Sequence, residues 1–366
     1  MKTKTLGIIS ANYNPAGFGE LTENRPIATV PYGGRYRLID FALSNMVNSG
    51  ITTVGLITPY FYRSIMDHVG IGKPWNLAKK TGGLFILPGT VFGQRNSESK
   101  FILRDFIRNR MIFDKSKADY VLISACSNVS NIDYQPFIEA HVKSGCPITL
   151  MYKDEPGHKD FKYLKLKRNG HVAQFRKAGE DSDHMFIGCM IFNKQFLLDF
   201  MKWYDAIDNM DITDIIEDHL SEFDVNTWKY DGYLGVVSSV PDYVRVNMEM
   251  MEPEVNDALF ASERLVYTKV QDEPPTIYKD GAKVSNSLVA AGCVIEGTVE
   301  NSVIFRACRI EKGSSVKNSI VMQHSVISKD AKIENTILDK YVTIEEGVEI
   351  KGSKSKPHII GKNRHF

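Results

Sequence analysis

The chain has 366 residues, enough for two domains and a large core, and its 43% hydrophobic and 24% charged residues are ordinary for a globular protein. Its 45 basic and 44 acidic residues leave a net charge of +1, which gives no general attraction to nucleic acid or to a membrane surface. No apolar stretch is long enough to span a bilayer, no signal peptide is recognisable and the five cysteines form no CxxC pair, so we expect a cytoplasmic protein in a reducing compartment.

Short apolar runs alternate with helical patterns over residues 1–252. We expect strands at 5–10, 52–58, 119–125 and 147–153, and helices at 37–50, 60–70 and 136–145. Such alternation predicts an α/β domain with a mainly parallel sheet and helices on both faces. Ligands of such sheets lie beyond the carboxyl ends of the strands, so the loop after residues 5–10 is the first candidate for a site.

The pattern changes after about residue 251. Residues 253–280 read as a short helix followed by an extended linker that contains two prolines. In residues 281–366 one phrase recurs, and its asparagines are spaced 15, 17 and 17 residues apart: Asn286, Asn301, Asn318 and Asn335. Aliphatic residues recur every six positions within these repeats: Ile304, Ile310, Val316, and then Leu338, Ile344, Ile350.

This six-residue rhythm is typical of a parallel β-helix, in which each hexapeptide forms one short strand. A meander of ordinary strands is the alternative, but such strands do not repeat a side-chain phrase at the spacing of a coil. The repeat predicts an architecture and no particular reaction, because β-helices serve enzymes and assembly alike.

Four phrases carry a resemblance to a known family: VPYGGRYRLIDFALSNMVNSGI (30–51), LITPYFYRSIMDHVGIGKPWNL (56–77), DITDII (211–216) and NSLVAAGCVIEGTVENSV (286–303). They resemble the glucose-1-phosphate adenylyltransferases, also called ADP-glucose pyrophosphorylases. The resemblance implies a Rossmann-like nucleotidyltransferase domain (1–252), a linker (253–280) and a left-handed β-helix of hexapeptide repeats with its tail (281–366). It also implies tetramers that use ATP, glucose 1-phosphate and Mg²⁺.

The chain departs from this family in the first loop. Two glycines of the family fall on Asn12 and Tyr13, its phosphate-binding arginine falls on Gly17, and a lysine falls on Ile27. Glycine allows backbone N–H groups to approach a phosphate closely, and arginine supplies a permanently charged, forked donor. The loop is therefore interpreted as a phosphate-binding loop that has lost its function.

The metal-binding and base-binding positions depart in the same way. The two aspartates that hold Mg²⁺ in the family fall on Ser127 and Val236, and the base-binding phrase begins at Phe101. Near the sugar phosphate Gly188 is kept, and the family's lysine falls on Ala178 or, with a shift of one residue, on Lys177. Other carboxylates could replace the lost metal ligands, and the candidates are Asp133, Asp211 and Asp214.

This pattern of loss resembles the non-catalytic, D-type subunits that accompany a catalytic subunit in some bacteria. It predicts a regulatory subunit of a hetero-oligomeric ADP-glucose pyrophosphorylase, with no catalytic residue and no metal of its own, whose catalytic partner uses Mg²⁺ and ATP. Self-association is also expected. The alternatives are an active nucleotidyltransferase with rearranged ligands, a self-standing sensor of sugar phosphates or nucleotides, and a β-helix acyltransferase that would have to use His324.

Three arginines near the family's effector-binding phrase remain candidates for regulation. Arg25 and Arg37 match family positions, Arg35 lies between them, and a neighbouring lysine of the family falls on Asn24. A phosphorylated metabolite would need such fixed cations. The alternative is that these arginines are solvated surface charges.

Overall fold

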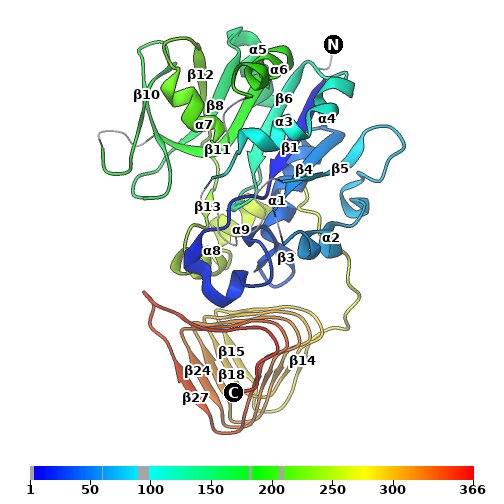
Figure 1. Cartoon of the computed structure of the whole chain (residues 1–366). Coiled ribbons are helices and arrows are strands. Elements are labelled where there is room, and N and C mark those ends of the chain that lie inside the picture. Colours follow the sequence, from blue (N-terminus) through cyan, green and yellow to red (C-terminus); the bar gives the residue numbers. More distant parts are fainter. Residues whose placement is uncertain (1–3, 60, 90–98, 181–183, 206–209) are drawn as a thin grey trace.

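The structure is a computed structural model that describes residues 4–59, 61–89, 99–180, 184–205 and 210–366. An α/β region formed by the N-terminal two thirds of the chain lies above a C-terminal β-helix in the view of Figure 1. Among the described helices none is long and apolar enough to cross a membrane.

The α/β region is built on a nine-stranded sheet with the order β10-β9-β11-β6-β1-β4-β5, in which β8 also pairs with β11 and β12 with β8. All strands but β10 and β11 run in one direction, which confirms the mainly parallel sheet. The strands are β1 (Thr5–Ser10), β4 (Thr53–Thr58), β5 (Gly83–Pro88), β6 (Tyr120–Ala125), β8 (Ile148–Asp154), β9 (Tyr163–Leu166), β10 (Val172–Arg176), β11 (His184–Asn193) and β12 (Val225–Lys229).

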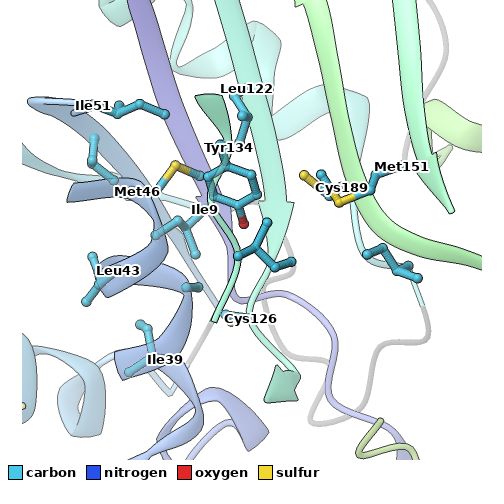
Figure 2. Packing of buried hydrophobic residues seen from close by; sticks show 14 of the residues in the cluster. Ile9, Ile39, Leu43, Met46, Ile51, Leu122, Cys126, Tyr134, Met151 and Cys189 are labelled. Carbon is cyan, nitrogen blue, oxygen red and sulfur yellow. The ribbon is translucent and has the colours of Figure 1, made fainter. Parts of the chain in front are cut away.

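Helices cover both faces of this sheet. Successive residues of a strand point to opposite faces, so a strand that is apolar throughout needs helices on both sides to bury its side chains. In β1, Ile8 packs into one hydrophobic cluster and Ile9 into another. Figure 2 shows Leu43 and Met46 of α1 beside the strands that carry Ile9 and Leu122. The helices are α1 (Leu38–Asn48), α2 (Arg63–Val69), α3 (Leu103–Arg108), α4 (Arg110–Lys115), α5 (Gln135–Ser144), α6 (Lys194–Trp203), α7 (Ile212–Asp218), α8 (Val240–Glu249) and α9 (Pro253–Phe260).

Short elements connect the sheet to the rest of the chain. They are the 3₁₀ helices η1 (Ala16–Thr22), η2 (Ile27–Thr29) and η3 (Lys73–Trp75), and the two-residue strands β2 (Pro31–Tyr32), β3 (Tyr36–Arg37), β7 (Asn128–Val129) and β13 (Gly235–Val236). The two pairs formed by these strands, β2 with β3 and β13 with β7, are antiparallel.

The C-terminal region is a parallel β-helix of three five-stranded sheets, β14-β17-β20-β23-β26, β15-β18-β21-β24-β27 and β16-β19-β22-β25-β28. Its strands are β14 (Ile277–Tyr278), β15 (Lys283–Ser285), β16 (Leu288–Val289), β17 (Val294–Ile295), β18 (Thr298–Glu300), β19 (Val303–Ile304), β20 (Arg309–Ile310), β21 (Ser315–Lys317), β22 (Ile320–Val321), β23 (Val326–Ile327), β24 (Lys332–Glu334), β25 (Thr336–Leu338), β26 (Thr343–Ile344), β27 (Glu349–Lys351) and β28 (His358–Ile360). The division of the chain at residues 252 and 280 stays a prediction; α9 and β14 both lie within the segment between them.

The repeated residues do what their spacing predicts. The six aliphatic residues are all buried in the core of the β-helix, where Ile310 stacks in register with Ile344 through an intervening strand. The four asparagines have φ between 40° and 48°, a left-handed conformation that asparagine tolerates better than most residues. Asn301 accepts a hydrogen bond from the Asn286 amide at 2.9 Å and donates one to Asn318 at 2.6 Å. The coil corners are therefore joined by side-chain amides.

A third hydrophobic cluster joins the two regions. Phe18 and Tyr243 of the α/β region pack in it with Val303 and Phe305 of the β-helix. Gly34 allows close contact here: its φ is +77°, and a Cβ at this position would lie 2.6 Å from Cδ2 of Leu288. The α/β region and the β-helix therefore pack directly against each other at this junction.

Candidate functional site

The loop that follows β1 lies at the carboxyl edge of the parallel strands, and a tyrosine fills it. Tyr13 is 4% exposed and packs in the cluster that joins the two regions. The ammonium group of Lys100 lies 5.0 Å from the centre of the Tyr13 ring and 3.5 Å from that of Phe161. An aromatic ring and a cation over its face therefore occupy the part of the loop where the family resemblance implies glycine backbone.

Asn12 is also buried and is held within the protein. Its amide Nδ2 donates a hydrogen bond to the Asp105 carboxylate of α3, and both residues are almost fully buried. The neighbouring Asn14 accepts a hydrogen bond through Oδ1 from the backbone N–H of Ile27 at 3.0 Å. These contacts fix the loop by internal partners.

The two positions where the resemblance implies cationic donors differ in their surroundings. Ile27 is 1% exposed and belongs to the hydrophobic cluster between the regions, so no charged group reaches the loop from it. Gly17 is exposed, and a Cβ built on it would meet nothing within 4 Å. The loop therefore has room for a side chain at Gly17 but presents none.

The structure brings together Ser127 and Val236, the two positions where the family resemblance implies metal ligands. Val236 in β13 pairs with Asn128 in β7, and Ser127 is the residue immediately before Asn128. Val236 is fully buried. The Ser127 hydroxyl and the Asn128 Oδ1 are buried and form no hydrogen bond with the part of the chain that the structure describes.

These residues do not fit Mg²⁺. The ion prefers octahedral oxygen ligands that include carboxylates, whereas this place offers a hydroxyl, an amide oxygen and an isopropyl group. The Asp211 carboxylate cannot serve instead, because it accepts bonds from the N–H groups of Lys100, Phe101 and Thr213 and caps α7. We derive no reaction step through a metal at this site.

The other two candidate carboxylates also have protein partners. Asp214 accepts a bond of 2.5 Å from the ammonium group of Lys162, and Asp133 accepts one of 2.9 Å from the backbone N–H of Gln135, the first residue of α5.

A cavity of about 230 Å³ lies beside the Asp211 cap, and it contains a lysine that was not predicted from the sequence. Lys100 lines it, and burial lowers the pKa of Lys100 to about 8, although Asp211 and Asp160 oppose this shift. The ring of Phe101 is buried at the same place, so the position where the resemblance implies a base-binding phrase lies in the hydrophobic core. Nothing in the sequence marks Lys100, because its neighbours in space are distant along the chain.

Gly188 is close to this lysine. Its φ is +76°, and a Cβ there would lie 3.1 Å from the Cβ of Ala125 and 3.9 Å from Cδ of Lys100. Lys177 is exposed, and its backbone N–H donates to the Glu180 carboxylate at 3.3 Å. The cation next to Gly188 is therefore Lys100, and a role of Lys177 toward a sugar phosphate stays a prediction.

A second and larger cavity, of about 590 Å³, lies at the junction between the α/β region and the β-helix. Six cationic side chains and four acidic ones line it, so its lining is net basic. The lining residues are Glu20, Leu21, Glu23, Asn24, Arg25, Arg37, Arg63, Ser64, Asp67, Asp339, Lys340, Gly361, Lys362 and Arg364.

Two of the three predicted arginines meet in this cavity. Arg25 donates from Nε to the carbonyl of Leu21 at 2.8 Å and pairs with Asp339 of the β-helix. Arg37 donates from Nη1 to the carbonyl oxygen of Ser64 at 3.0 Å. Burial lowers the pKa of Arg37 to about 10, and the charge of Asp40 opposes this shift, so the group stays a cation at neutral pH.

Arg35 does not line this cavity. It is exposed, and its guanidinium lies 5.4 Å from the centre of the Tyr36 ring. Lys340, which was not predicted from the sequence, lines the cavity where Arg35 does not. Burial and the charges of Arg37 and Arg25 lower the pKa of Lys340 to about 7. An anion bound among these cations would be stabilised by each of them.

Comparison with known proteins identifies relatives of both regions. Residues 18–233 match the nucleotidyl transferase family model, and residues 275–356 match the model of the GlmU-like C-terminal hexapeptide. The chain is 38% identical to the glycogen biosynthesis protein GlgD of Geobacillus stearothermophilus over 99% of this chain and 97% of the relative. It is 34% identical to GlgD of Bacillus subtilis (strain 168), over 85% of this chain and 82% of the relative. It is 30% identical to a glucose-1-phosphate adenylyltransferase of Geobacillus stearothermophilus, over 86% of this chain and 84% of the relative.

Proposed function

The chain belongs to the ADP-glucose pyrophosphorylase family, within which it is GlgD-like, and we propose that it is a catalytically deficient, regulatory subunit of a hetero-oligomeric ADP-glucose pyrophosphorylase in glycogen biosynthesis. The holoenzyme would convert ATP and glucose 1-phosphate to ADP-glucose and pyrophosphate, and the catalytic partner would carry out this reaction.

The observation that carries the proposal is the pair of positions Ser127 and Val236. Val236 lies opposite Asn128 in the pair of β13 with β7, and Ser127 directly precedes Asn128, so the two positions are close, as two ligands of one ion must be, yet neither is a carboxylate. Nucleotidyl transfer concentrates negative charge on phosphoryl oxygens, and without a metal or compensating cations that charge is not stabilised.

The first loop supports the same conclusion. The Tyr13 ring packs where a phosphate would need backbone N–H groups, Gly17 presents no side chain, and Ile27 is buried among apolar groups. Loss of a single stabilising donor costs about 10²–10³ in rate when an oxyanion-hole donor is taken as the scale, and such losses are not additive. Together these changes leave this chain little means of catalysis.

A subunit without chemistry affects its partner only by favouring one conformation of the complex. The basic cavity at the junction is where we expect an effector to act, because Arg25 pairs with the β-helix while Arg37 is held by α2, so an anion there would contact both regions. The effector class we propose is a phosphorylated metabolite.

The test is an assay of ADP-glucose formation by the full chain alone, by a catalytic subunit alone and by the mixture. We expect no Mg²⁺-dependent turnover by the chain alone, and in the mixture a higher turnover or a changed effector response. A mixture made with a catalytic subunit that lacks a metal-binding aspartate is the control and should be inactive. Turnover by the pure chain would overturn the proposal.

A further inference from the structure

A cysteine, a histidine and an aspartate that line neither of the two cavities lie close together. The Sγ of Cys146 is 3.6 Å from Oδ2 of Asp224, and Nδ1 of His171 is 2.6 Å from Oδ1 of the same carboxylate. One ligand atom from each residue lies within 4.8 Å of the other two. Within the described ranges of the chain this is the one group of three such side chains that could share an ion.

We propose that Cys146, His171 and Asp224 bind a thiophilic divalent cation, with Zn²⁺ as the chemical type. A thiolate, an imidazole and a carboxylate are ligands that Zn²⁺ accepts together, whereas Mg²⁺ and Ca²⁺ prefer oxygen alone. Three protein ligands leave the fourth position of a tetrahedral ion to water.

Three separate segments converge to form this site. Cys146 precedes β8 and Asp224 precedes β12, and these strands pair in parallel with Ile148 opposite Val225, so both ligands lie at the same ends of neighbouring strands. His171 lies in the turn between β9 and β10. A hydrogen bond of 2.5 Å from the Thr227 hydroxyl to the carbonyl of Gly170 fastens this turn to β12.

The site lies away from the nucleotidyltransferase machinery. Cys146 is at the amino end of β8, which runs in the same direction as β1 and β6. The loops with Tyr13 and Ser127 follow the carboxyl ends of β1 and β6, at the opposite edge of the sheet. The proposed ion would therefore join the β9–β10 hairpin to the sheet rather than take part in phosphoryl chemistry.

The cysteine and the Oδ2 atom of Asp224 already have a separation that suits the ion, whereas the histidine must move. Zn–S and Zn–O bonds of about 2.3 and 2.0 Å place the two ligand atoms about 3.5 Å apart in a tetrahedron, close to the 3.6 Å between Cys146 and Asp224. His171 now contacts the other carboxylate oxygen, Oδ1, at 2.6 Å, and this hydrogen bond must open so that Nδ1 can bind the ion about 3.3 Å from the oxygen ligand. On binding, the Cys146 thiol releases its proton to solvent, and the imidazole binds in its neutral form.

Access to the site is from the side of the carboxylate. Cys146 is 6% exposed, whereas the side chain of Asp224 is 57% exposed and that of His171 is 19% exposed. A hydrated cation would therefore meet Asp224 first and the thiol last. The buried thiol is positioned by neighbours in the same turn, since the hydroxyl of Ser144 accepts a bond from its backbone N–H at 3.1 Å.

The experiment is a titration of the reduced, metal-stripped full chain with Co²⁺, followed by competition with Zn²⁺. We expect one equivalent to bind with a thiolate-to-cobalt charge-transfer band in the near ultraviolet, which Zn²⁺ removes. Cys146→Ser should abolish the band, and Asp224→Asn should weaken Zn²⁺ binding by about tenfold or more.

The matched control is His184→Asn. His184 contacts Asp154 with the same Nδ1 to Oδ1 distance of 2.6 Å, and this pair is not part of the metal cluster, so its loss should leave Co²⁺ and Zn²⁺ binding unchanged. Asp224 is an exposed side chain, so Asp224→Asn keeps the test valid if Cys146→Ser fails to fold. The absence of a charge-transfer band in the folded wild-type chain, or a Zn²⁺ affinity unchanged by Asp224→Asn, would overturn the proposal and leave the proposed function untouched.

Discussion

Arg25, in the segment between η1 and η2, forms an ion pair with Asp339, the residue that follows β25 of the β-helix. Their side chains are 9% and 2% exposed, and the two residues are separated by most of the sequence. The guanidinium is also bound to the carbonyl of Leu21, so the pair connects the loop that follows β1 to the β-helix. Any change at the α/β loop is thereby linked to the position of the C-terminal region.

The first prediction concerns this pair. Arg25→Ala leaves the Asp339 carboxylate buried without its cation, so we expect the free energy of unfolding to fall by about 3–5 kcal/mol. Urea unfolding of the full chain measures this effect. The exposed pair of Arg110 and Asp114 is the control, because both side chains are more than 40% exposed; Arg110→Ala should cost about 0.5 kcal/mol. Equal effects of the two variants would contradict the assignment of Arg25 as a structural connection.

The second prediction concerns the altered phosphate loop. Tyr13→Ala removes a ring from a packed cluster and should destabilise the chain by about 3 kcal/mol. Gly17→Arg adds a side chain where a Cβ meets nothing within 4 Å, so we expect a change of at most about 0.5 kcal/mol. Thermal denaturation of both variants distinguishes these effects. A large loss of stability in Gly17→Arg would show that the fold requires glycine at this position.

The third prediction is a pH dependence of anion binding at the junction cavity. Lys340 has a pKa of about 7 in the folded chain against an ordinary value of 10.5, so the unfolded state binds more protons between these pH values, and stability of the anion-free chain rises with pH across this window. A bound anion favours protonated Lys340 instead. Sulfate binding should therefore weaken by about tenfold from pH 6 to pH 8.5, when one charge-assisted bond is lost.

Sulfate suits this measurement because its own charge does not change over that range. Calorimetric titration at several pH values gives the affinity, and Lys340→Met should both weaken binding at pH 6 and flatten its pH dependence. Sulfate affinity that is independent of pH in the wild-type chain would show that Lys340 does not contact the anion.

The β-helix was predictable from sequence because its coils repeat. A residue such as Ile310 packs against the equivalent residue one coil away, so the spacing of aliphatic residues along the chain predicts which side chains contact one another. The mainly parallel sheet followed from alternating elements for a similar reason. The positions of Ser127 and Val236 could be paired only through the family resemblance, since more than a hundred residues separate them.

Lys100 and Lys340 show what could not be predicted. Burial by distant segments lowers the pKa of both lysines, and for Lys340 the charges of Arg37 and Arg25 lower the pKa further. Arg35 shows the converse: its closeness to Arg37 in sequence suggested a shared site, but Arg35 lies in the turn before β3, outside the strand that carries Arg37, and does not line the cavity. Contacts across the junction determine which cations face the cavity.

The fourth prediction tests whether the cavity governs the response of the mixed complex to an effector. Arg37→Ala removes a cation held by Ser64 at the cavity wall, so we expect the effector concentration for half-maximal response to rise by about tenfold while assembly is unchanged. Size-exclusion chromatography checks assembly, and turnover at increasing effector concentration checks the response. Arg35→Ala is the matched control, because Arg35 is exposed and does not line the cavity. If Arg37→Ala complexes keep the full response, the effector acts through the catalytic subunit and this chain influences it through interface contacts alone.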